Sequence, residues 1–130
     1  MKYVYPAVLT PEDGAYLVAF PDLENCFTDG ADLCEALEMA QDVLNLMLMT
    51  MEDDRLPIPA ASAASAVSCE PGSLVTLVSA DTTEYRKKYG NYAVKKTLSI
   101  PAWLNTLAEE NGVNFSAKLQ EALRAKLEIA

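Results

Sequence analysis

The segment VKKTLSIPAWLNTLAEENGVNFSAKLQEALRAKL, residues 94–127, decides the fold of the C-terminal part of this chain. Residues 94–100 alternate between apolar and polar side chains, which is the pattern of a half-buried β-strand. The apolar side consists of Val94, Leu98 and Ile100, and the polar side consists of Lys95, Thr97 and Ser99. A strand over 94–100 with one hydrophilic side is therefore predicted.

Two helices are predicted after this strand. Pro101 ends the strand and fits the first turn of a helix over 102–111, which Gly112 terminates. Asn114 caps the second helix, whose apolar stripe contains Leu119, Ala122, Leu123 and Leu127. About thirty-five residues with a single strand are too few to close a hydrophobic core. The strand needs a partner, and a second copy of the chain is the obvious one.

This order of strand, helix, Asn-Gly turn and helix resembles the ribbon-helix-helix repressors of the Arc/MetJ type. In these proteins two chains pair their strands into a ribbon that enters the DNA major groove, over a core of four shared helices. The polar side of the strand would meet base edges, the lysine on its core side would reach a phosphate, and the first turn of the second helix would offer backbone amides to another phosphate. The residues expected to contact DNA are Lys95, Lys96, Thr97, Ser99, Asn114, Phe115 and Ser116. A charged strand edge that only prevents aggregation would carry the same lysines, so this alternative stays open.

The charge is spread unevenly along the 130 residues. Residues 1–80 contain two basic and thirteen acidic residues, a net charge of −11, whereas residues 81–130 contain eight basic and six acidic residues, a net charge of +2. The acidic part should repel nucleic acid and attract a basic protein, while the rest tolerates a phosphate backbone. Two halves with different partners are expected.

Composition argues against several classes of protein. The chain has no histidine, so the commonest general base and the Ser-His and Cys-His pairs are missing. Its three cysteines, Cys26, Cys34 and Cys69, form no CxxC pair, and small buried hydrophobes are the favoured interpretation. We predict no catalytic site, metal or cofactor. No membrane-length apolar run and no signal peptide are seen, so a cytoplasmic protein is expected.

The front half is predicted to be an α+β layer. Two strands, 3–9 and 15–20, are joined by the hairpin loop TPEDG, and a third is expected at about 25–28. Pro6 argues that the first strand lies at an edge or contains a bulge. The run SLVTLVSA at 73–80 has little polar alternation, which favours a central strand with two buried faces.

Two helices complete this half. Asp32 and Glu35 form a capping box for an amphipathic helix over 33–51, and Asp81 and Gly90 bound a short helix. The apolar stripe of the long helix contains Leu33, Leu37, Ala40, Leu44, Met47, Leu48 and Met51. The Pro- and Ala-rich residues 52–72 form a surface connection that is too apolar at Leu56 and Ile58 to be fully free.

The whole front half, with the tail, is similar to the HicB antitoxin family. Members have an acidic-Gly hairpin, a PDLPG-like turn, a GxT motif and a helix rich in EAL. The counterparts here are Gly14, Pro21-Asp22-Leu23, Gly30 and Glu35-Ala36-Leu37. Two departures are Glu24-Asn25, where the family usually has Pro-Gly, and Asp32, where Thr is common. The second is an exchange between good helix N-caps.

The resemblance implies an N-terminal partial ribonuclease H-like domain at 1–90, an antiparallel sheet with a packed helix and no activity, and a ribbon-helix-helix domain at 91–130 that dimerises through its strand. HicB proteins neutralise HicA, a small basic toxin that cuts RNA, and repress their own operon. The acidic residues expected to meet the toxin are Asp22, Glu24, Asp29, Glu52, Asp53 and Asp54. Homodimers, and dimers of these dimers, are expected. The alternatives are a dimeric interaction module without DNA binding and a relic metal-dependent nuclease, against which the strand at 3–9 lacks an acidic residue.

Overall fold

The computed structural model describes residues 1–129 and divides the chain into two compact units. The first is Met1–Tyr92 and the second begins at Ala93.

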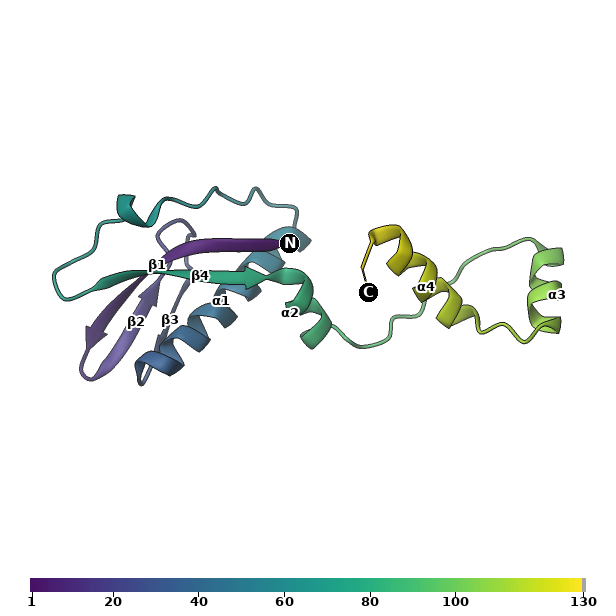
Figure 1. The fold of residues 1–130 in the computed structure, drawn as a ribbon, viewed down its shortest axis with the longest axis horizontal. Coiled ribbons are helices and arrows are strands. Elements are labelled where there is room, and N and C mark those ends of the chain that lie inside the picture. Colours follow the sequence, from purple (N-terminus) through teal and green to yellow (C-terminus); the bar gives the residue numbers. More distant parts are fainter. Residues whose placement is uncertain (130) are drawn as a thin grey trace. The chain divides into compact units, whose positions relative to one another are not determined.

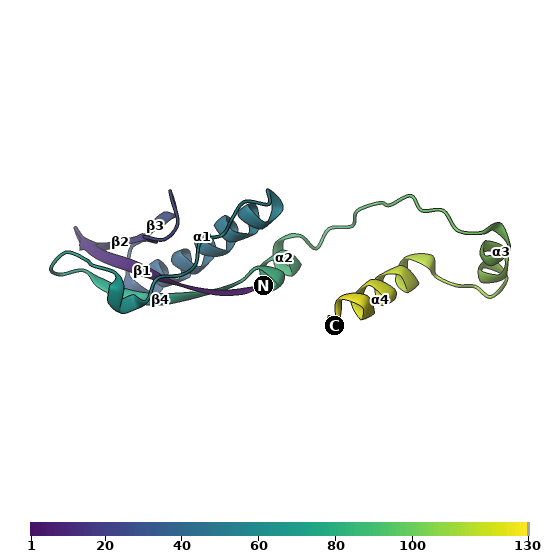
Figure 2. The ribbon, with the colours of Figure 1, turned by 90° about the horizontal axis from the view of Figure 1, so that it is seen from above.

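The first unit is a four-stranded antiparallel sheet with helices on it. The strand order is β3-β2-β1-β4, and the strands are β1 (Lys2–Glu12), β2 (Ala15–Ala19), β3 (Phe27–Gly30) and β4 (Leu74–Asp81). The helices are α1 (Leu33–Asp53), the single turn η1 (Ala64–Ala66) and α2 (Thr82–Tyr89). Figures 1 and 2 show α1 running along one face of the sheet, with α2 following directly after β4. The predicted α+β class with an antiparallel sheet and a packed helix is confirmed.

The β1–β2 hairpin forms as the sequence predicts. Asp13 and Gly14 both adopt positive φ, 50° and 82°, between the paired residues Glu12 and Ala15. Two residues with positive φ are what a two-residue hairpin turn requires, and Asp-Gly supplies them.

The core lies between the sheet and α1. Asp32 caps α1 by accepting a hydrogen bond from the Glu35 amide at 2.8 Å, as predicted. The fully buried apolar residues of α1 are Ala36, Ala40, Leu44 and Leu48, one on each successive turn. Leu33 and Leu37, predicted to be on the buried stripe, are 44% and 41% exposed. The stripe is displaced because small alanines let the first half of α1 approach the sheet closely.

The prediction for β4 is wrong. β4 is an edge strand and not a central one. Both of its faces carry apolar side chains, but only Val78 and Ala80 are buried against the core, while Leu74 and Leu77 are 44% and 57% exposed. A weak polar alternation shows that both faces are apolar and does not show that both are covered.

Pro6 lies in a strand that is interior in the sheet order, yet it is paired on one side only. It faces Leu77 of β4, and the pairing with β2 stops at Val8. The prediction that this strand lies at an edge or contains a bulge is wrong, because β1 is interior and its registers with β2 and β4 run without interruption. Pro6, which lacks an amide hydrogen, lies where β1 pairs only with β4. β3 begins at Phe27, two residues later than the expected strand at 25–28.

The second unit contains two helices, α3 (Ala102–Glu110) and α4 (Phe115–Leu127). Asn114 caps α4 through its side chain, and Gly112 between the helices has a positive φ of 63°. Residues 94–100 are not a strand in the single chain, which corrects the sequence prediction at this level. A strand is defined by hydrogen bonds to a neighbouring strand, and residues 94–100 are paired with no strand within residues 1–129.

Candidate partner-binding surfaces

One of the acidic segments predicted to meet a partner, the turn with Asp22 and Glu24, lines a groove. The groove has a volume of about 530 Å³ and lies between the β2–β3 turn, the second half of α1 and the segment that follows it. Asp22 and Glu24 lie on one side, and the opposite side is apolar, with Met47, Met51 and Ile58. An apolar floor beside carboxylates is a surface suited to a basic partner.

The two carboxylates of this turn differ in availability. Asp22 is partly buried and accepts hydrogen bonds from the Ser62 amide and hydroxyl, at 2.9 and 2.6 Å, so it fixes the segment after α1. Glu24 is exposed and has no side-chain bond within residues 1–129. Glu24 is therefore the freer acid of the turn. Asp29 is exposed on β3.

The acidic residues at the end of α1 also differ in their contacts. Glu52 accepts hydrogen bonds from the hydroxyls of Tyr3 and Thr82, at 2.7 and 2.9 Å, and from the Arg86 guanidinium at 3.1 Å. Asp53 pairs with the same guanidinium at 2.8 Å. Glu52 and Asp53, two of the predicted toxin contacts, thus hold α2 against α1, whereas the Asp54 side chain is exposed and makes no bond within residues 1–129.

The pKa values in this network follow from its contacts. Burial alone would raise the pKa of Glu52, but the hydrogen bonds from Tyr3, Arg86 and Thr82 outweigh it and leave that pKa below its usual value. Burial, followed by the bond to the Glu52 carboxylate, raises the pKa of Tyr3 to about 12. The network is thus built around a charged Glu52.

The cysteines agree only partly with the expectation. Cys26 is buried in the core, and this burial raises the pKa of its thiol to about 11, so it is the small hydrophobe that was predicted. Cys34 and Cys69 are exposed free thiols, contrary to that interpretation.

The second unit buries none of its large apolar side chains. Between residues 93 and 129 no residue is buried, although both helices carry apolar stripes. The exposed large apolar residues there are Val94, Leu98, Ile100, Trp103, Leu104, Leu107, Phe115, Leu119, Leu123, Leu127 and Ile129. Fully burying one such side chain stabilises a protein by about 1.5–3 kcal/mol, so this unit lacks the main source of folding free energy. It is incomplete as a single copy.

The predicted DNA-contacting residues all lie on the surface of this unit. Lys95, Lys96, Thr97 and Ser99 are exposed and make no side-chain bond within residues 1–129. The Asn114 side chain accepts from the Ala117 amide at 3.0 Å, and its carbonyl accepts from the Lys118 amide at 3.0 Å. The amides of Phe115 and Ser116 have no such partner, so they are the free donors of the first turn.

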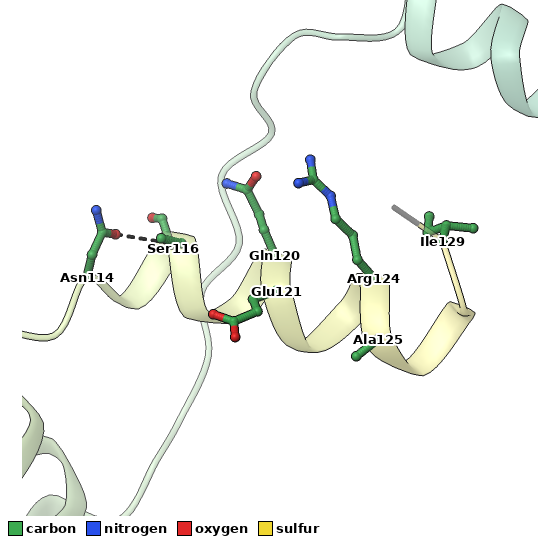
Figure 3. Close-up of a pocket in the computed structure, with 8 residues that line it drawn as sticks. Asn114, Ser116, Gln120, Glu121, Arg124, Ala125 and Ile129 are labelled. Atoms are coloured by element: carbon green, nitrogen blue, oxygen red, sulfur yellow. Dashed lines mark hydrogen bonds between the residues drawn. The ribbon is translucent and has the colours of Figure 1, made fainter.

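One face of α4 carries polar residues that the sequence analysis did not single out. Figure 3 shows Ser116, Gln120 and Arg124 extending from the same side of α4, with Asn114 at its start. They line a shallow hollow of about 580 Å³. Their four-residue spacing was readable in the sequence as a polar stripe beside that of Leu119 and Leu123.

Two further surfaces of the first unit were also missed. The face of the sheet away from α1 exposes Val4, Leu17, Phe27 and Leu77, which alternation along each strand would have placed together once the strand order was known. A groove between α1 and α2 contains the buried Asn45. No single pattern in the sequence marks that groove, because it joins residues from two helices far apart in the chain.

Within residues 1–129, no three His, Cys, Asp or Glu side chains are grouped as metal ligands. None of the helices in that range is long and apolar enough to cross a bilayer. The features that do stand out are grooves, exposed apolar faces and a helical unit without a core. These features are typical of a protein that acts by binding partners.

Comparisons with known proteins identify the family. Residues 4–69 match the model of the HicB_like antitoxin of bacterial toxin-antitoxin system. The chain is 43% identical over 58 residues to "Antitoxin HicB 1" of Photorhabdus laumondii, which covers 42% of this chain and 37% of that one. The match thus spans well under half the length of that relative.

Solved structures extend the likeness over the tail. A toxin-antitoxin complex from Streptococcus pneumoniae contains a chain that is 30% identical, with a TM-score of 0.62, covering 97% of this chain and 99% of that one. The antitoxin HicB of Burkholderia pseudomallei, 18% identical, matches the fold with a TM-score of 0.56 over 93% of this chain and 96% of that one. The chain belongs to the HicB-like antitoxin family. The relatives are named as antitoxins and not as enzymes, in agreement with the expectation from the sequence.

Proposed function

We propose that this protein neutralises a HicA-type toxin with its first unit and binds operator DNA with its second, thereby repressing its own operon in the cytoplasm. Family membership supports the antitoxin role, and the similar chain from Streptococcus pneumoniae was solved as a toxin-antitoxin complex. The proposed dimerisation and DNA binding rest on one observation: no large apolar side chain of the second unit is buried.

The toxin would dock on the groove beside the β2–β3 turn. Met47, Met51 and Ile58 supply an apolar centre, and Glu24 supplies an unpaired charge at the rim. Apolar contacts at the centre hold a complex together, while rim charges mainly raise the association rate. Asp54 and Asp29 remain candidate toxin contacts, although they are not among the residues that line this groove, whereas Glu52 and Asp53 pair with Arg86.

A charge reversal tests this surface. Glu24→Lys should slow association with the toxin encoded by the neighbouring gene by roughly tenfold at low salt, because the rim charge that steers a basic protein is inverted. Glu70→Lys is the matched control, since Glu70 is equally exposed and lies outside the groove. Equal association rates for both variants would remove the turn from the interface.

The second unit would gain its core from a second copy of the chain. Pairing of two 94–100 segments would place Val94, Leu98 and Ile100 over the stripes of four helices. It would leave the polar side of the ribbon facing outward. This is the ribbon-helix-helix arrangement, in which the first unit is free to pair separately into a dimer of dimers.

DNA binding is tested with a fragment from upstream of the gene. Lys95→Ala should weaken binding to all sequences, while Thr97→Ala and Ser99→Ala should change base preference by about 1–3 kcal/mol per lost contact. Lys87→Ala removes the same charge from the first unit and serves as the control for Lys95→Ala. If Thr97 and Ser99 variants keep the wild-type preference, these residues do not read bases. If no fragment binds, the chain is a dimeric interaction module.

A further inference from the structure

The groove between α1 and α2 carries an unusual combination of groups. It has a volume of about 570 Å³ and lies wholly within the first unit. Its carboxylates are Glu38 and Asp42 on α1, Asp81 at the end of β4, and Glu84 on α2; its one cation is Lys88 on α2. Glu84 already pairs with Lys87 at 3.1 Å, and Asp81 accepts from two α2 amides. The remaining charge of Glu38 and Asp42 favours a cation.

A buried acceptor lies among the groove residues. Asn45 is only 8% exposed, and its Nδ2 donates to the Gln41 carbonyl at 3.0 Å. Its Oδ1 is buried and has no hydrogen-bond partner within residues 1–129. An unsatisfied buried carbonyl oxygen costs about 1–3 kcal/mol, so a ligand that donates to it recovers that free energy. The missing group must be a donor.

Two aromatic rings form part of the same wall. The rings of Tyr85 and Tyr89 lie 4.6 Å apart between centroids, and the Tyr85 hydroxyl donates to Asp42 Oδ1 at 3.3 Å. Lys88 Nζ already lies 5.2 Å from the centre of the Tyr89 ring. Lys88 thus makes a cation–π contact inside the groove, although an ammonium is a less suitable partner for a flat ring than a planar cation.

We propose that this groove binds an arginine side chain presented by a basic protein partner. A guanidinium stacks on tyrosine rings, pairs with carboxylates and has five N–H donors, one of which can satisfy Asn45 Oδ1 after a rearrangement that exposes this buried atom. The four acids are spread over three elements and do not converge as metal ligands, which suits an extended organic cation. The assignment of the partner rests on the proposed function, because the toxin is the basic protein expected to bind the first unit.

The site itself is tested without the toxin. N-acetyl-arginine amide, titrated into the isotope-labelled full chain, should shift the Asn45 side-chain amide and the Tyr89 ring resonances saturably. N-acetyl-citrulline amide, which is nearly the same shape but uncharged, should not, and the lysine amide should bind more weakly. No saturable shift, or an equal response to the citrulline or lysine probe, overturns the guanidinium site.

Variants of the groove residues test whether the arginine probe binds in this groove. Glu38→Gln with Glu84→Gln should weaken the arginine probe roughly fivefold, since two exposed charge pairs are lost. Glu12→Gln with Glu70→Gln makes the same charge change away from the groove and should leave binding unchanged. Lys88→Ala should tighten binding about threefold, because the resident cation is removed. Unfolding would weaken binding of the probe, so tighter binding by Lys88→Ala cannot result from a loss of stability. Equal affinity in all three variants contradicts the proposal.

The partner is tested separately with the co-expressed toxin. Glu38→Gln with Glu84→Gln should bind toxin several-fold more weakly than the control double variant. If both bind it equally, the groove does not receive the toxin, although the antitoxin function stands. If neither the variants nor the wild-type chain bind it, the proposed function fails first, and the inferred partner fails with it.

Discussion

Asn25 shows how a single residue preserves a turn whose sequence differs from the family pattern. The family usually has Pro-Gly where this chain has Glu24-Asn25, and Asn25 adopts a φ of 59°. This left-handed conformation is natural for glycine and tolerated by asparagine. Asn25 therefore supplies the positive φ of this turn without a glycine, next to Glu24 at the groove.

Substitutions at Asn25 should separate backbone conformation from side-chain chemistry. Asn25→Ala should lower the free energy of unfolding by about 1 kcal/mol relative to Asn25→Gly, because an alanine Cβ is strained at positive φ. Urea denaturation of the two variants measures the difference. Equal stabilities would mean that the turn relaxes to another conformation.

Gly30 is required for a different reason, since the start of α1 packs directly on it. A Cβ built at Gly30 would lie 2.3 Å from the Ala36 nitrogen and 2.5 Å from its Cα. Backbone atoms cannot move aside as a flexible side chain can. Gly30→Ala should therefore lower the free energy of unfolding by about 1–3 kcal/mol.

The same denaturation experiment measures this cost. Ser65→Ala, an exposed position in η1, is the control and should change the stability little. A Gly30→Ala variant as stable as this control would show that α1 does not approach the sheet as closely as described.

At the scale of elements, the junction of β1, α1 and α2 should respond to acid. The pKa of Glu52 is lower in the folded chain than its ordinary value of 4.5, so the unfolded chain takes up the proton first as the pH falls. The stability that Glu52 contributes is therefore complete above pH 4.5 and is lost as the pH falls through the folded-state pKa.

Glu52→Gln removes this titration. The variant should be less stable than wild type at neutral pH, and the difference should shrink as the pH falls below 4.5. Chemical denaturation of both chains across this range measures it. A difference that stays constant with pH would show that Glu52 is not held in its charged form.

The elements of the first unit were largely predictable because their signals are local. The Asp-Gly turn, the Asp32 cap and the helical spacing of α1 each lie within a few residues of what they determine. The error at β4 has a different origin. SLVTLVSA is apolar on both faces, but which neighbours cover a strand depends on sheet order, and local pattern carries no information on that order.

The residues of the candidate sites also differ in how far the sequence predicts their roles. Exposure of Glu24 and Lys95 could be expected from their residue types, whereas the use of Glu52 and Asp53 as partners of Arg86 depends on contacts between distant segments. The α1–α2 groove could not be predicted, since Asn45 and Tyr85 come together only in the fold.

At the scale of the whole molecule, we propose that two chains complete one another through their tails. The apolar side chains of α3 and α4 are exposed in one copy, and the 94–100 segment has no strand beside it. Thr97 is the middle residue of that segment. In an antiparallel ribbon symmetric about its centre, Thr97 of one chain lies opposite Thr97 of the other.

The most direct measurement is a disulfide cross-link at that centre. The full chain with Cys34→Ser and Cys69→Ser, which removes the exposed thiols, carries Thr97→Cys or, as the control near the end of the segment, Val94→Cys. Under mild oxidation Thr97→Cys should form a covalent dimer rapidly, because a disulfide needs Cβ atoms about 3.5–4.5 Å apart, and Val94→Cys should not. A chain that sediments as a monomer and forms no Thr97→Cys cross-link would contradict the shared ribbon.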